Sequence, residues 1–372
     1  MVLLYYLRIL LIGIDYLLML IMYDNINSYI NKERIYVMLH TKTRDYYFDN
    51  LKFILILLVV IGHTIEPLID ISGKLKILYC YIFSFHMPLF VFVSGYFSKN
   101  YIDNSKNVKS IQRFLIPYLL FQTLYVLFYK YLLNVPGTQI TLVTPIYLMW
   151  YLLSAFVWIL ITPYFTKLKH CIPIAFILAI LVGYAPDIST YLSLSRIIVF
   201  FPFYLIGYYI NKSTIEKLFN KKIKIISLLI LIVAFLTSLK IPTTFNAAWF
   251  YGRDNYVLLG SPFWYSGIFR IFIYIINILM CISVLSLTPN HKTKISKYGA
   301  NTIYIYLFHG FIIKYFVFRT QIYQSIDNSL SKIVLIVISI IITFLLGSKF
   351  FIKLTKFLVE PQINNLFKKE LQ

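Results

Sequence analysis

The chain has 372 residues, of which 60% are hydrophobic and 13% are charged, and its formal net charge at pH 7 is +21. Soluble domains carry about 25% charged residues, so this composition excludes an ordinary water-soluble fold and predicts an integral membrane protein with the lipid bilayer as its solvent. The positive charge does not indicate a nucleic-acid partner, because the lysines lie in short segments between apolar stretches and no recognition module or basic stripe is present.

The first 23 residues are apolar but contain Arg8 and Asp15, and no small-residue cleavage site follows them. This pattern is not that of a signal peptide. Two interpretations stay open: an extra span with its N-terminus outside, or upstream translation with a later start at Met38. We therefore separate an N-terminal extension, residues 1–43, from a main domain, residues 44–372.

Beyond residue 50 the sequence contains ten apolar stretches, most of them near the 20 residues that a helix needs to cross the hydrocarbon. The predicted fold class is therefore all-α: a polytopic membrane protein with about ten core transmembrane helices and one possible extra helix at the N-terminus. The fifth stretch is short. The predicted spans are 52–72, 76–97, 113–133, 142–165, 171–185, 191–211, 223–240, 264–288, 301–318 and 332–357.

The positions of lysine and arginine predict the orientation of these spans. With the segment before residue 52 in the cytoplasm, the cytoplasmic segments carry 23 of the 35 basic residues and the outer loops carry six. Cytoplasmic loops of membrane proteins carry an excess of basic residues. We therefore expect both ends of the ten-span unit, including the C-terminus, to lie in the cytoplasm.

Polar side chains follow one face of the first predicted span. Lys52 and His63 are three helical turns apart, about 16 Å along the axis, and Glu66 and Asp70 continue this face outwards. An ionisable group inside a span is costly and points to function, although His63 could serve only a helix–helix hydrogen bond. A cation at the mouth and an imidazole deeper inside suit a long anionic ligand such as coenzyme A.

Two further histidines, His86 and His309, fall at mid-depth in other predicted spans. Together with His63 they allow a metal-binding interpretation, since histidine is a common zinc ligand. The three residues lie on different spans, however, so their spacing is not diagnostic.

Two arginines, Arg196 and Arg270, lie in the outer parts of their predicted spans. They could pair with Glu66 and Asp70 to line a polar vestibule, or they could extend to the membrane interface. The outer loop 240–263 is rich in aromatic and polar residues, which suits either contact with a sugar or an interfacial aromatic belt.

Several motifs resemble those of a known family. The run Arg44–Lys52 followed by Val59–His63 resembles the opening of the membrane acyltransferase 3 family, in which a basic residue precedes a histidine at this spacing. The stretch Phe85–Phe97 is similar to the family's aromatic-Ser-Gly-aromatic stretch, and its His-Met-Pro form resembles the fucose 4-O-acetylase-like subgroup. The resemblance covers about residues 44–357. Supporting matches are Trp150-Tyr151-Leu152, Ile206-Gly207-Tyr208-Tyr209 and Tyr304-Ile305-Tyr306-Leu307-Phe308-His309.

This resemblance implies a membrane acyltransferase domain over residues 44–372 in the plasma membrane. Such an enzyme transfers an acyl group, usually acetyl, from cytoplasmic acyl-CoA to a hydroxyl of a cell-surface or lipid-linked glycan. Acetyl-CoA is then the acyl donor, no metal is expected, and the chemistry is O-acetylation of a cell-envelope polysaccharide. The sugar, its hydroxyl and the acyl group stay open.

The resemblance also implies roles for single residues. His63 would be the catalytic histidine and Lys52 its basic partner. Independently of the resemblance, we expect Glu66 to orient His63, because a carboxylate beside an imidazole can do so. The family's Arg-x-x-Arg motif is replaced here by Lys109 and Arg113, spaced four apart, which we expect beside Lys52 at the CoA phosphates. The candidates for substrate binding are Asp70, His86, Arg196, Arg270 and His309.

Two alternatives belong to other classes. A glycan or lipid transporter would share the ten spans and the vestibule, but the sequence has no repeated halves or paired interrupted spans. A metal-dependent membrane hydrolase would use His63, His86 and His309 as ligands.

Overall fold

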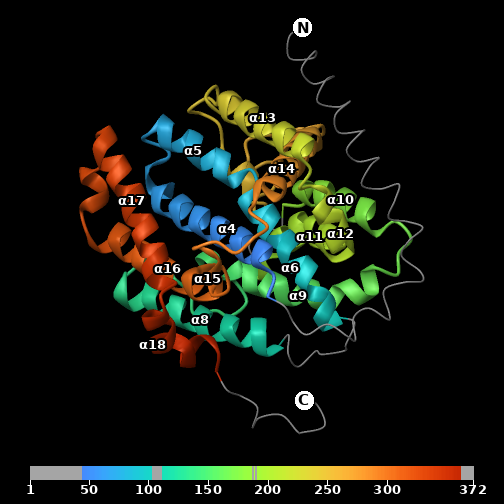
Figure 1. Cartoon of the computed structure of the whole chain (residues 1–372). Helices are drawn as coiled ribbons and strands as arrows, with labels where there is room; N and C mark the ends of the chain where they lie inside the picture. Colours follow the sequence, from blue (N-terminus) through green and yellow to red (C-terminus); the bar gives the residue numbers. More distant parts are fainter. Residues whose placement is uncertain (1–43, 103–110, 187, 189–190, 362–372) are drawn as a thin grey trace. The chain divides into compact units, whose positions relative to one another are not determined.

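The computed structural model describes residues 44–102, 111–186, 188 and 191–361 (Figure 1), so the N-terminal extension and Lys109 lie outside the described residues. Within the described part of the chain every regular element is a helix. Residues Tyr46–Gln372 belong to one unit of packed helices. A helix satisfies its backbone polar groups internally, which is why so apolar a chain adopts this fold.

Seven segments in the described ranges are long and apolar enough to cross a membrane. The three other predicted spans coincide with α10 (Cys171–Leu181), α13 (Lys221–Ser238) and α16 (Thr302–Arg319). The prediction of an all-α, polytopic membrane protein is confirmed, and the number of spans stays a prediction. The seven segments are Tyr46–Leu68, Gly73–Lys99, Arg113–Leu132, Tyr147–Phe165, Tyr191–Tyr209, Ser266–Leu287 and Ser329–Leu346. They contain α4 (Tyr46–Ile65), α5 (Gly73–Phe83), most of α6 (His86–Ile102), α8 (Ile116–Leu127), α9 (Trp150–Phe165), α11 (Leu194–Tyr209), α14 (Ser266–Leu287) and α17 (Ser329–Leu346).

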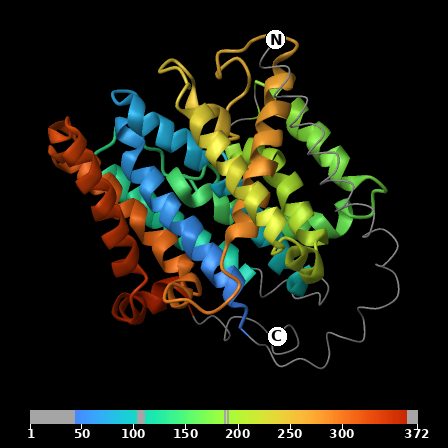
Figure 2. The same ribbon diagram turned by 45° about the horizontal axis from the view of Figure 1, so that its top comes forward.

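Helix α4 is enclosed by its neighbours (blue in Figures 1 and 2). It packs against α5, α6, α16, α17 and the short α15 (Ser296–Gly299). Its side chains Leu51, Leu55 and Val60 are fully buried. Because α4 is surrounded by protein, the polar residues at its C-terminal end are held among other helices.

The tenth predicted span is wrong as a single helix. Helix α17 ends at Leu346, and a separate helix, α18 (Lys349–Val359), follows. Gly347 stands at the C-cap of α17, and the Ser348 side chain accepts a hydrogen bond from the Phe351 amide to begin α18. Glycine after a helix and serine before one are ordinary stop and start signals, and the apolar character of the stretch concealed them.

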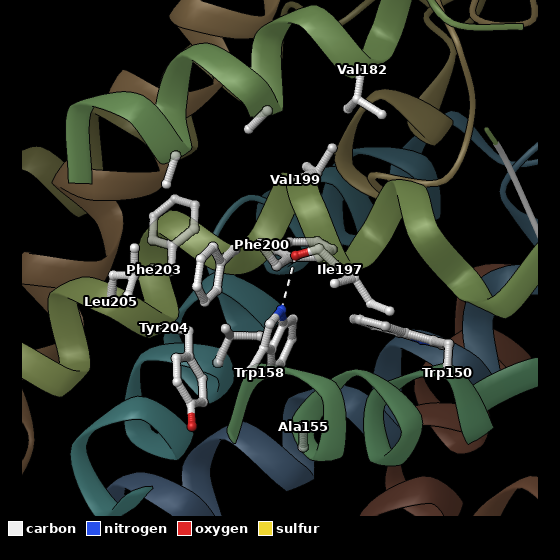
Figure 3. Packing of buried hydrophobic residues seen from close by; sticks show 14 of the residues in the cluster. Trp150, Ala155, Trp158, Val182, Ile197, Val199, Phe200, Phe203, Tyr204 and Leu205 are labelled. Atoms are coloured by element: carbon white, nitrogen blue, oxygen red, sulfur yellow. Dashed lines mark hydrogen bonds between the residues drawn. The ribbon is translucent and has the colours of Figure 1, made fainter. Parts of the chain in front are cut away.

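Helices α9 and α11 are joined by a buried aromatic cluster. Figure 3 shows the Trp158 indole of α9 donating a hydrogen bond to the Ile197 carbonyl of α11, with an N···O distance of 2.9 Å. Trp150 at the start of α9 stacks on Phe200, with ring centroids 5.5 Å apart. This cluster fixes the beginning of α9, and therefore the short helix η4 (Tyr147–Met149) that leads into it.

Helices α6 and α11 approach closely through two glycines. A Cβ on Gly207 would lie 2.0 Å from the Phe92 carbonyl oxygen, and a Cβ on Gly95 would lie 1.9 Å from that of Tyr204. Small residues at a helix interface allow such close contact in membranes.

We therefore expect Gly207→Ala to destabilise the protein by about 2–3 kcal/mol, because the added methyl group overlaps backbone rather than a movable side chain. The midpoint of thermal unfolding in detergent should fall by about 3–4 °C. Gly73→Ala is the matched control, since its added Cβ would meet its nearest neighbour at 3.6 Å. Equal midpoints for the two variants would contradict the close contact.

Candidate functional site

His63 and Glu66 form a pair where α4 ends. The His63 Nδ1 atom lies 3.4 Å from Glu66 Oε2, and both side chains are partly buried. A separation of three residues places them on one side of the helix. Pro67 follows at the start of the short helix η1 (Glu66–Leu68), where the α-helical hydrogen bonding stops. The predicted proximity of Glu66 to His63 is confirmed, and their catalytic roles stay predictions.

Lys314 of α16 joins this pair, and the sequence interpretation missed it. Its Nζ lies 3.5 Å from the same Glu66 Oε2, and its side chain is 14% exposed. Nζ also lies 4.2 Å from the centroid of the Tyr147 ring. Lys314 stands within a predicted span, so the rule that singled out His63 could have identified it too.

The rings of Tyr147 and His309 lie beside the His63 imidazole. The ring centroid of Tyr147 is 4.8 Å from that of His63, and the centroid of His309 is 5.5 Å away. Tyr147 has a positive φ of 54°, a conformation that non-glycine residues rarely adopt and that occurs mainly where function or packing requires it. Residues from α4, η4 and α16 thus meet at His63.

Buried polar atoms at this site have no partner among the described residues: His309 Nε2 and the Tyr147 hydroxyl. His309 Nδ1 lies 2.9 Å from the Ile305 carbonyl oxygen. A carbonyl only accepts, so Nδ1 carries the hydrogen and Nε2 presents its lone pair. An unsatisfied buried polar atom costs about 1–3 kcal/mol, so both atoms are suited to contact a polar ligand.

His86 is close to this site but separated from His63 by Phe83. It is the first residue of α6, is 1% exposed, and donates from Nδ1 to the Ile82 carbonyl at 2.9 Å. The Phe83 ring lies 4.4 Å from the His86 ring and 6.2 Å from the His63 ring. Within the described ranges, no group of three histidine, cysteine or acidic residues is arranged to hold a metal ion.

The structure describes two of the three cations that the sequence predicted near the N-terminal end of α4. Lys52 Nζ lies 3.0 Å from Asp49 Oδ1 and 5.8 Å from the Phe97 ring centroid. Arg113 is exposed at the N-terminal end of its segment, and Lys109 is outside the described residues. The grouping of Lys52, Lys109 and Arg113 around one ligand stays a prediction.

Of the two alternatives for the arginines, pairing with Glu66 and Asp70 is not found among the described residues. Arg196 Nε donates to the Tyr251 carbonyl at 3.3 Å, and its guanidinium lies 4.8 Å from the Trp150 ring centroid. Arg270 is 2% exposed and donates to the Trp249 carbonyl at 2.9 Å. Among the described residues, backbone carbonyls and aromatic faces are their partners.

The acidic residues have other partners. Glu66 contacts Lys314, whereas the Asp70 side chain is 88% exposed and lies 3.7 Å from Lys76 Nζ. The two arginines therefore hold the outer loop in place, and their predicted role in binding substrate remains untested.

A hollow of about 420 Å³ lies beside Asp70. Tyr251 lines it and accepts a hydrogen bond from the Tyr79 hydroxyl at 2.8 Å. Burial raises the pKa of Tyr251 to about 12, so its hydroxyl keeps its proton at physiological pH.

Aromatic packing connects this hollow to the site, because Tyr79 stacks on Phe83 and Phe83 contacts His63. The lining residues of the hollow are Ile69, Asp70, Lys76, Thr243, Thr244, Phe245, Asn246, Ala247, Ala248 and Tyr251.

Comparison with known proteins identified a family. A family model described as an acyltransferase domain, that of the acyltransferase 3 family, matches residues 45–348. No curated protein and no solved structure matched the chain. The matched range contains His63, Glu66, Tyr147, His309 and Lys314.

Proposed function

The chain belongs to the acyltransferase 3 family, and from this premise we propose that it is a plasma-membrane O-acyltransferase that transfers an acetyl group from cytoplasmic acetyl-CoA to a hydroxyl of a cell-surface or lipid-linked glycan. The observation that carries the proposal is the His63–Glu66 pair, which lies beside two buried polar atoms that have no partner in the described part of the chain. This arrangement suits proton transfer from a hydroxyl.

In the proposed step, the acceptor hydroxyl gives its proton to His63 Nε2 while its oxygen forms a bond to the thioester carbonyl carbon. The carbon–sulfur bond of the donor then breaks, and His63 returns the proton to the departing thiolate. The products are an O-acyl ester and coenzyme A. Glu66 orients His63 through Nδ1, and general-base catalysis of this kind contributes about 10²–10⁴-fold.

Tyr147 and His309 complete the proposed site. The free Tyr147 hydroxyl is a donor for the oxygen that becomes negative when the carbonyl carbon is attacked. His309 Nε2 is an acceptor that suits the attacking hydroxyl or another sugar hydroxyl. Both groups are fixed by the surrounding helices, so little reorganisation is needed when charge develops.

The two substrates would approach from opposite ends of α4. Coenzyme A phosphates suit the end with Lys52, about 16 Å along the helix from His63, where we also expect Lys109 and Arg113. The hollow beside Asp70 and Tyr251 suits a hydroxyl-rich acceptor at the other end. With the C-terminus in the cytoplasm, the donor end faces the cytoplasm and the hollow faces outside.

The function is tested by the mass profile of surface glycans from cells that express the chain and from cells that lack it. We expect a mass increase of one acetyl group per modified sugar only in the expressing cells. An unmodified glycan whose amount at the surface changes would instead support the transporter alternative. Identical glycans in identical amounts would contradict both functions.

Replacing Lys52 with alanine should raise the KM for acetyl-CoA about tenfold with a smaller effect on kcat, because a charge-assisted contact to phosphate is worth about 1.5 kcal/mol. The measurement is the initial rate of labelled acetyl transfer in isolated membranes over a range of acetyl-CoA concentrations. Lys169→Ala, which removes an exposed lysine, is the control. A fall in kcat alone would show that Lys52 does not bind the donor.

A further inference from the structure

Lys314 and His63 both contact one carboxylate oxygen of Glu66. Lys314 Nζ and His63 Nδ1 lie 3.5 Å and 3.4 Å from Glu66 Oε2. The lysine comes from α16 and the histidine from α4, so two separate helices supply the groups that face this oxygen. The single negative charge of Glu66 is therefore shared by Lys314 and His63, each of which can carry a positive charge.

Few other charged side chains lie near Glu66 in the described structure. The His309 ring lies beside that of His63, and the hydroxyls that interact electrostatically with Glu66 are those of Tyr79, Tyr129, Tyr147, Tyr251 and Tyr323. Phenols are neutral at physiological pH. Arg196 and Arg253 act on Glu66 at longer range, and their hydrogen bonds go to Tyr251 and Asp254. Among the lysines and arginines of the described structure, Lys314 forms an ion pair with Glu66, and its ammonium group also lies 4.2 Å from the Tyr147 ring centroid.

This balance of charge bears on the proposed chemistry, because a base must be unprotonated before it can act. An unpaired carboxylate beside His63 would stabilise the imidazolium, which cannot accept a proton. A lysine on the same carboxylate offsets that attraction, while Glu66 still accepts the hydrogen bond from Nδ1. His63 then keeps its orientation and leaves its Nε2 lone pair free.

We propose that Lys314 is a positioning residue that neutralises Glu66, so that Glu66 orients His63 without its full negative charge favouring the imidazolium. The inference rests on the proposed acyl transfer. It assigns a role to a residue that touches neither substrate in the proposed step. Lys314 acts through Glu66, and its removal should change the pH at which His63 works.

The test compares Lys314→Met and Lys314→Arg in isolated membranes, which contain the natural acceptor, with labelled acetyl-CoA as the probe. For Lys314→Met we expect the rate at pH 7 to fall about threefold and the acidic limb of the pH–rate profile to move up by about one pH unit. Activity should largely return at pH 8.5–9. Lys314→Arg should retain most of the activity because the positive charge remains. Lys130→Met is the matched control, since Lys130 is an exposed lysine over another tyrosine ring.

A double variant tests the proposal even if the Lys314→Met protein does not accumulate in the membrane. Glu66→Gln with Lys314→Met removes both charges and leaves neither one unpaired. We expect it to be as active as Glu66→Gln alone, because Lys314 acts only by neutralising Glu66. A double variant at least tenfold less active than Glu66→Gln would overturn the proposal, as would a Lys314→Met rate that is unchanged or reduced equally at every pH.

The failure of this inference differs from the failure of the proposed function. If wild-type membranes transfer no label to glycan, the acyl-transfer proposal itself is wrong. If wild type transfers label but the Lys314 variants give the unshifted profile, only the role of Lys314 is wrong.

Discussion

His63→Ala should lower the rate of acetyl transfer about 10³-fold, the largest effect that we expect of any single substitution. The variant removes the group proposed to accept the hydroxyl proton, and general bases contribute about 10²–10⁴-fold. His63 is only partly buried, so the truncation should cost little stability. The rate is measured with saturating labelled acetyl-CoA in membranes that contain equal amounts of each protein.

The matched control for this experiment is His170→Ala. His170 is exposed at the N-cap of α10, so its loss removes a histidine without changing the site. A His63→Ala variant that retains more than a tenth of the wild-type rate would be incompatible with a general-base role.

Tyr147→Phe is expected to lower kcat about 10²-fold without changing the KM for acetyl-CoA. The substitution deletes one hydroxyl proposed to stabilise the developing negative charge, and loss of one such donor typically costs 10²–10³-fold. That hydroxyl is buried and has no partner among the described residues, so its removal breaks no hydrogen bond there. The thermal midpoint should therefore stay unchanged or rise while activity falls.

Tyr118→Phe gives the opposite combination and serves as the control. The Tyr118 hydroxyl donates to the Leu142 carbonyl at 2.6 Å, so its removal leaves a carbonyl without that partner. We expect a loss of about 1 kcal/mol in stability with unchanged kcat. If Tyr147→Phe behaves like Tyr118→Phe, the Tyr147 hydroxyl has a structural role and not a catalytic one.

The local parts of the site could be predicted because they depend on helical periodicity. His63 and Glu66 are three residues apart, so a helix brings them together whatever surrounds it. The ends of the last apolar stretch could also have been read from Gly347 and Ser348, had the turn signals been weighed above hydropathy. The sequence left the partners of Arg196 and Arg270 open, because carbonyls and aromatic rings compete with carboxylates for a guanidinium.

By itself the sequence determined the fold class, the family and the His63–Glu66 pair. These follow from the cost of apolar surface in water, from the match over residues 45–348, and from spacing along one helix. Only the tertiary structure decided that Lys314 shares the carboxylate of Glu66 and that Tyr147 and His309 face His63. Those contacts join segments far apart in the chain, and they depend on how α4, η4 and α16 pack, which no local spacing encodes.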